Sequence, residues 1–76
     1  RMDLVINYGS DEFIVELKLW RGEKYERSGL DQLAEYLDIR GKDEGYLVTF
    51  DFTKNKVFRE PSWVEHNGKR IFEVII

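Results

Sequence analysis

The chain has 76 residues, with 12 basic and 15 acidic side chains, a net charge of −3 and no cysteine. This length fits one small domain, and a hydrophobic content of 42% excludes a disordered chain. The charge excludes a general electrostatic attraction to nucleic acid, so any contact with nucleic acid is expected to be local.

No apolar run approaches the roughly 18 residues that cross a membrane, and no leader resembles a signal peptide. Together with the absence of cysteine, this predicts an intracellular, cytoplasmic protein without a membrane partner. The sequence begins with Arg1 rather than Met, from which we expect a C-terminal fragment of a longer protein.

The first 19 residues have the pattern of a β-hairpin. Residues 3–8 and 13–19 alternate apolar and polar side chains, and residues 9–12 are typical of a turn. Two registers are possible, one with a tight turn at Gly9 and Ser10 and one with a four-residue loop. They place Asp3 directly opposite either Glu16 or Lys18.

Either register brings Asp3, Glu16 and Lys18 to one face of the hairpin. The opposite face is uniformly apolar, and we expect it to be the core. Its side chains are Leu4, Ile6, Tyr8, Phe13, Val15, Leu17 and Leu19.

Two converging carboxylates repel each other unless a cation compensates them. Oxygen ligands in a chain with one histidine and no cysteine favour Mg²⁺ or Mn²⁺ over zinc. Spacing alone also fits a more common arrangement, in which Glu16 and Lys18 lie on a solvated strand face and Asp3 forms an ion pair with Lys18.

A helix is expected over residues 29–39, after a charged connector at residues 20–27. Ser28 and Asp31 resemble a capping box, and Gly41 is placed to end the helix. The buried stripe consists of Leu30, Leu33, Ala34 and Leu37. Gln32 and Tyr36 lie off this stripe, so periodicity predicts a solvated glutamine and a half-buried tyrosine.

The C-terminal half reads as strands. Residues 46–52 are expected to pair in parallel with residues 13–19, because a helix separates them. The remaining strands, a short one at Val57 and Phe58 and a hairpin of residues 62–65 and 69–76 around the Asn67-Gly68 turn, are expected to be antiparallel. The predicted fold is an α/β domain with a mixed sheet and one helix packed on one face, and His66 is expected at its surface.

Three motifs together resemble a known family: Asp3, then Glu16-Leu-Lys18, then Gln32-Leu-Ala-Glu-Tyr36. The pattern is similar to the PD-(D/E)XK nuclease superfamily, in the branch with a Gln-x-x-x-Tyr helix. More narrowly, it resembles the nuclease-like domain at the C-terminus of bacterial AAA-type ATPase-like proteins. The resemblance covers nearly the whole chain, so residues 1–76 would form a single domain of this type.

The resemblance implies a restriction-endonuclease-like fold and assigns roles to six residues. Asp3 and Glu16 would ligate Mg²⁺ or Mn²⁺, and the backbone carbonyl of Leu17 would complete the metal shell. Lys18 would orient the attacking water, while Gln32 and Tyr36 would project toward the same site. The implied activity is hydrolysis of nucleic-acid phosphodiester bonds, in DNA rather than RNA, with an ATPase domain upstream.

The family core has a helix before the strand that carries the aspartate, and this sequence has no such helix. The expected fold is therefore an N-terminally truncated core. The alternative function is a catalytically inactive nuclease-fold module that binds nucleic acid or a partner. A missing helix would also leave apolar sheet surface uncovered, so we expect the chain to form a homo-oligomer.

Overall fold

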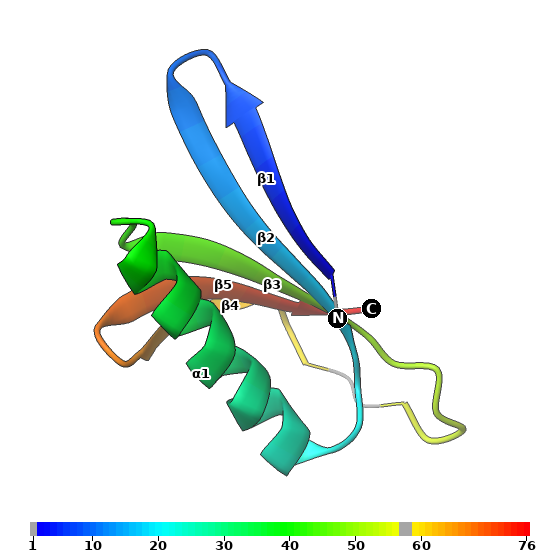
Figure 1. The fold of residues 1–76 in the computed structure, drawn as a ribbon. Coiled ribbons are helices and arrows are strands. Elements are labelled where there is room, and N and C mark those ends of the chain that lie inside the picture. Colours follow the sequence, from blue (N-terminus) through cyan, green and yellow to red (C-terminus); the bar gives the residue numbers. More distant parts are fainter. Residues whose placement is uncertain (1, 57–58) are drawn as a thin grey trace.

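The computed structural model describes residues 2–56 and 59–76, with side chains described from Leu4 onward. One helix packs on one face of a five-stranded mixed sheet with the strand order β1-β2-β3-β5-β4 (Figure 1). The elements in chain order are β1 (Met2–Tyr8), β2 (Asp11–Leu19), α1 (Glu23–Ile39), β3 (Glu44–Phe50), β4 (Ser62–His66) and β5 (Lys69–Ile75). The α/β class and the single covering helix are thus confirmed.

The N-terminal hairpin adopts the tight-turn register. β1 and β2 pair antiparallel with Asp3 directly opposite Glu16, and their outermost pair is Tyr8 with Asp11. Only Gly9 and Ser10 remain between the strands, which is the shortest common hairpin connection. The register therefore puts the two predicted metal ligands in adjacent positions on neighbouring strands.

The helix begins six residues earlier than the sequence predicted. Gly22 is its N-cap, and the first backbone bond runs from Glu26 N to Gly22 O at 3.0 Å. The capping-box prediction at Ser28 is wrong, because Glu23 and Glu26 already give the preceding turn the acidic side chains that favour a helix N-terminus.

The predicted end of the helix is correct. Gly41 has a φ of 70°, and Lys42 N bonds to Leu37 O at 2.8 Å. This left-handed glycine with its backward backbone bond is the arrangement that commonly terminates helices.

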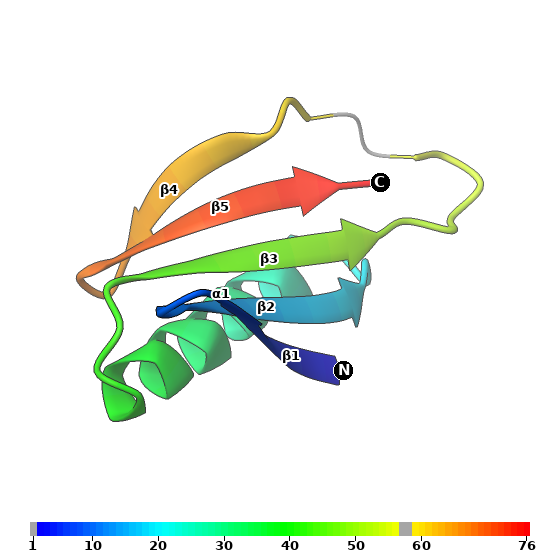
Figure 2. The same cartoon turned by 90° about the horizontal axis from the view of Figure 1, so that it is seen from above.

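The sheet combines parallel and antiparallel pairs. β2 and β3 are parallel, as predicted. β5 also pairs parallel with β3, so the expectation of antiparallel pairing there is wrong (Figure 2). After β3 the chain crosses to the far edge of the sheet and forms β4, then returns as β5 between β3 and β4. The antiparallel strand on this side of the sheet is therefore β4. The predicted strand at Val57 and Phe58 lies outside the described residues.

The second hairpin agrees with its sequence signal. Asn67 and Gly68 have φ values of 51° and 78°, and His66 pairs with Lys69 across the turn. Positive φ at both central residues is the geometry for which Asn-Gly is preferred.

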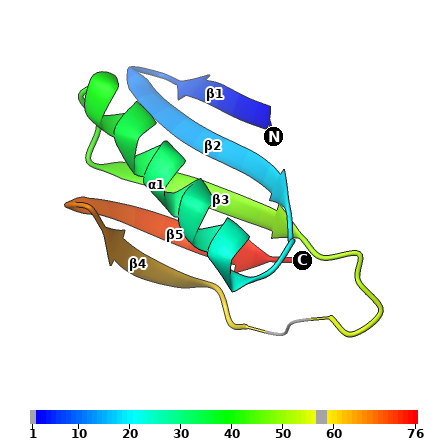
Figure 3. The same cartoon turned by 60° about the horizontal axis from the view of Figure 1, so that its bottom comes forward.

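Figure 3 shows α1 over one face of the sheet. Glu16 and Lys18 are buried on that face, so the predicted core face is the open one. The buried hydrophobic core between helix and sheet consists of Ile14, Leu33, Ala34, Leu37, Leu47 and Ile71. Gly45 permits this close approach, since a Cβ there would lie 2.9 Å from Leu37 Cδ1. The prediction of the core face failed because the crossover connection, rather than the apolar pattern of one hairpin, decides which face a helix covers.

Candidate functional site

Glu16 lies in the middle of β2 and points beneath the helix. Its side chain is completely buried, with 0% exposed. The Cα atoms of Asp3 and Glu16 are direct cross-strand partners, so both residues belong to the same face. The side chain of Asp3 lies outside the described part of the chain.

Lys18 follows two residues later on the same face and is 7% exposed. Its Nζ donates a hydrogen bond to the Tyr25 backbone carbonyl at 3.0 Å and lies 4.0 Å from the centre of the Tyr25 ring. The interpretation of Glu16 and Lys18 as a solvated strand face is therefore wrong, because both charged groups are buried against the helix.

Gly29 makes room for the lysine. A Cβ at this position would lie 2.7 Å from Lys18 Cδ, and closer still to Nζ. The N-terminal half of α1 thus rests directly on the Lys18 side chain. A cation near a helix N-terminus is disfavoured by the helix dipole, so the placement of Lys18 does not stabilise the helix by that route.

Beneath the helix, the buried charged side chains of β2 are followed by a second group on β5, which the sequence did not reveal. The Glu73 side chain is 5% exposed, and Arg59 Nη1 lies 3.4 Å from its Oε1 and 2.5 Å from Glu26 Oε2. Burial raises the pKa of Glu73 to about 7, with a further contribution from Glu26 and an opposing one from Arg59. At neutral pH this carboxyl group can therefore hold or release a proton.

Asp51 and Thr49 complete the buried polar layer on β3 and just beyond it. Both are almost fully buried. Asp51 Oδ1 accepts hydrogen bonds from Thr53 N at 2.9 Å and from Thr53 Oγ1 at 2.5 Å. The sequence placed Asp51 within a strand, and no spacing signal linked it to Glu16 or Glu73.

Gln32 and Tyr36 share one flank of the helix, as their spacing requires. Gln32 is exposed, and the half-buried Tyr36 packs against the hydrophobic core. Both line a shallow pocket of about 250 Å³ with Glu35 and Ile39, and the lining of that pocket includes neither Glu16 nor Lys18.

The donor groups on this face decide which metal ion could bind. Among the side chains that the structure describes, no three His, Cys, Asp or Glu residues form a group that could hold a metal ion. The set implied by the resemblance is Asp3, Glu16 and the Leu17 carbonyl. It needs the Asp3 side chain, which lies outside the described side chains. The oxygen chemistry of the set fits Mg²⁺ or Mn²⁺.

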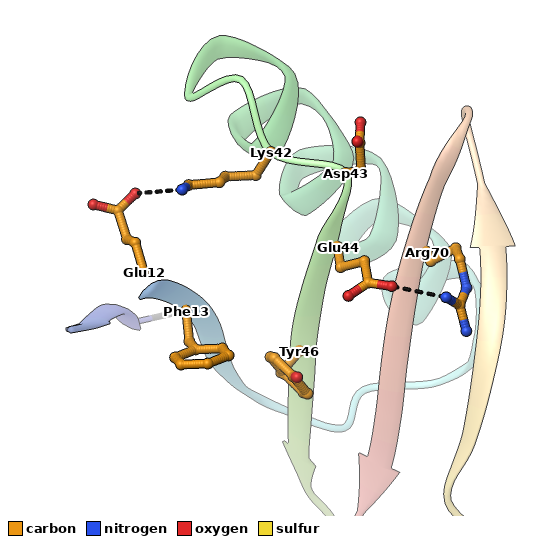
Figure 4. Close-up of a pocket in the computed structure, with 7 residues that line it drawn as sticks. All are labelled: Glu12, Phe13, Lys42, Asp43, Glu44, Tyr46 and Arg70. Carbon is orange, nitrogen blue, oxygen red and sulfur yellow. Dashed lines mark hydrogen bonds and ion pairs between the residues drawn. The ribbon is translucent and has the colours of Figure 1, made fainter. Parts of the chain in front are cut away.

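A larger pocket, of about 350 Å³, lies away from these residues (Figure 4). Its charged lining is paired: Arg70 Nη1 lies 2.7 Å from Glu44 Oε2, and Lys42 Nζ lies 3.8 Å from Glu12 Oε1. Because its charges already neutralise one another, we do not assign the site to this pocket.

Among the described residues, no helix has the length and apolarity required to cross a membrane.

Comparison of the chain with protein-family models, with curated proteins and with solved structures gave no match. The functional assignment below therefore rests on the residues of this chain and on their arrangement.

Proposed function

We propose that this chain is a nuclease domain of the PD-(D/E)XK type, with a restriction-endonuclease-like core, that hydrolyses phosphodiester bonds of DNA with Mg²⁺ or Mn²⁺. The observation that carries the proposal is the joint burial of Glu16 and Lys18 on one face, with Asp3 in register opposite Glu16. Buried charges are costly, so a strand with no use for them would be expected to carry apolar residues there.

The order of elements also supports the proposal. The strand with Asp3, the strand with Glu16 and Lys18, the helix with Gln32 and Tyr36, and a further parallel strand follow one another as the resemblance requires.

In the proposed reaction, Asp3, Glu16 and the Leu17 carbonyl would hold the metal ion. When bound, the ion supplies a Lewis acid that polarises the phosphate and lowers the pKa of a water molecule. The Lys18 ammonium bonds to the Tyr25 carbonyl and lies on the same face as Glu16. Its charge would orient the water and offset the charge that develops on the phosphate.

The test is metal-dependent nicking of plasmid and cleavage of single-stranded DNA. Lys18→Met keeps the volume of the buried side chain and removes its charge, so cleavage should fall about 100-fold or more. Asp3→Asn and Glu16→Gln should abolish metal-dependent cleavage. Lys24→Met, which alters an exposed lysine in the first turn of α1, should cleave like the wild type.

Cleavage that survives in all three site variants would refute the assignment of these residues. Absence of cleavage by the wild type, with Mg²⁺ and with Mn²⁺, would favour the second candidate, a catalytically inactive binding module. One observation favours that candidate: a carboxylate with 0% exposure, such as Glu16, meets a substrate only after neighbouring groups move.

A further inference from the structure

Figure 3 shows α1 on one face of the sheet, and the opposite face carries two apolar rows that run across the strands. One row of neighbours crosses all five strands: Leu4 beside Val15, then Tyr46, Phe72 and Trp63. The adjacent row continues from Leu17 through Val48 to Val74. Neither row contains a charged residue.

These side chains are exposed to a degree that is unusual for large hydrophobic groups. Exposed fractions on this face are 70% at Tyr8, 48% at Ile6 and 41% at Trp63. The aromatic rings contact one another, with centroids 5.2 Å apart for Trp63 and Phe72 and 5.8 Å for Tyr46 and Trp63. We call the surface formed by these two rows and the neighbouring Ile6 and Phe13 the open face, and its rings and aliphatic side chains form a packed layer without a cover.

The core on the helix-covered side of the sheet buries too little apolar surface to offset this exposure. Among the described residues it fully buries six hydrophobic side chains, while five buried residues there are polar or charged. A domain of this size is close to the lower limit at which one core suffices. Covering the open face would supply the apolar burial that the interior lacks.

We propose that the open face is the interface of a symmetric homodimer, in which two sheets pack face to face. Five strands about 4.8 Å apart and roughly six residues long give a flat footprint on the order of 500 Å². Side-chain relief adds to this area, and a biological interface needs about 500 Å² or more from each partner. A two-fold axis uses the same surface twice, which suits the two neutral rows, and the charges of Arg70 and Glu44 beside them are paired with each other.

A second copy fits this face better than a nucleic acid does. Single-stranded nucleic acids need cations beside the aromatic rings. Arg70, which lies 4.6 Å above the Trp63 ring, is already paired with Glu44 at 2.7 Å, and the rows themselves are neutral. Apolar sheets instead pack on one another about 10 Å apart in β-sandwiches.

Sedimentation equilibrium of the full chain over a range of concentrations tests the proposal. The wild type should dimerise, and Ile6→Glu on the open face should raise the dissociation constant at least ~100-fold, because a charge would be buried without a partner. Ile39→Glu is the matched control: Ile39 is 73% exposed but lies at the end of the helix, so this variant should dimerise like the wild type.

Tryptophan fluorescence keeps the test decisive if Ile6→Glu fails to fold. In Trp20→Phe the open face is intact and Trp63 is the remaining tryptophan. Its emission should shift to shorter wavelength as concentration rises and the ring leaves water. A wild type that stays monomeric, whether or not it binds single-stranded DNA, overturns the proposal. So does a dimer that Ile39→Glu weakens as much as Ile6→Glu, or a Trp63 emission that is independent of concentration.

Discussion

At the scale of single residues, the contact between Lys18 and Gly29 decides how the helix sits on the sheet. No room remains for a Cβ at position 29 while the lysine side chain occupies its place. Gly29→Ala should therefore destabilise the fold by roughly 1 to 3 kcal/mol, the usual cost of overpacking. Urea denaturation measures this loss.

The same contact predicts coupling between the two positions. In a Lys18→Ala background the obstacle is gone, and Gly29→Ala should be neutral or stabilising by up to ~1 kcal/mol, because alanine is the better helix former. Ser28→Ala, at the neighbouring exposed position, should show no such dependence on Lys18. Equal costs of Gly29→Ala in both backgrounds would contradict the described packing.

Glu73 gives the fold a specific pH dependence. Its pKa is raised from 4.5 to about 7, first by burial and then by Glu26. The folded state therefore binds a proton more tightly than the unfolded state, so the free energy of unfolding should fall as pH rises from about 4.5 to about 7. The expected loss is on the order of 1 to 3 kcal/mol.

Glu73→Gln, which resembles the protonated carboxyl group, should remove this loss. The variant should be more stable than the wild type at pH 8 and similar to it at pH 5. Glu35→Gln, on the exposed side of α1, serves as the control. A wild-type stability that does not change between these two pH values would exclude the described environment of Glu73.

At the scale of elements, the sequence and the structure differ in where α1 begins, and a substitution at Ser28 tells the two starts apart. If Ser28 were the N-cap, Ser28→Ala would cost about 1 kcal/mol. Because α1 begins at Glu23, Ser28 lies within the helix, and the same change should be neutral or slightly stabilising. Thermal unfolding followed by circular dichroism distinguishes these outcomes.

At the scale of the whole molecule, the proposed metal site predicts linkage between binding and folding. A divalent ion that binds the folded chain alone should stabilise it by about 2.7 kcal/mol at 100 times its dissociation constant. The melting temperature with and without Mg²⁺ or Mn²⁺ measures the effect. Glu16→Gln should abolish it, and Glu35→Gln, on the exposed side of α1, should not. An equal shift in both variants would place the ion elsewhere.

The sequence by itself determined the features that depend on neighbouring residues. The turn after residue 8, the Asn67-Gly68 hairpin, the end of the helix at Gly41 and the common face of Asp3, Glu16 and Lys18 follow from backbone preferences and strand alternation, which act over a few positions. The structure then selected the register that pairs Asp3 with Glu16. For this reason the two acidic residues and Lys18 could be assigned to one face before the structure was known.

Only the tertiary structure decided which face the helix covers, and with it the burial of Glu16 and Lys18. It also inserted β5 between β3 and β4 and brought Glu73, Glu26 and Arg59 together from three separate segments. These contacts join residues far apart in the chain, and strand alternation is the same whichever face is covered. The choice between the two faces is therefore a property of the crossover and of the packing of the whole domain, which a local pattern cannot specify.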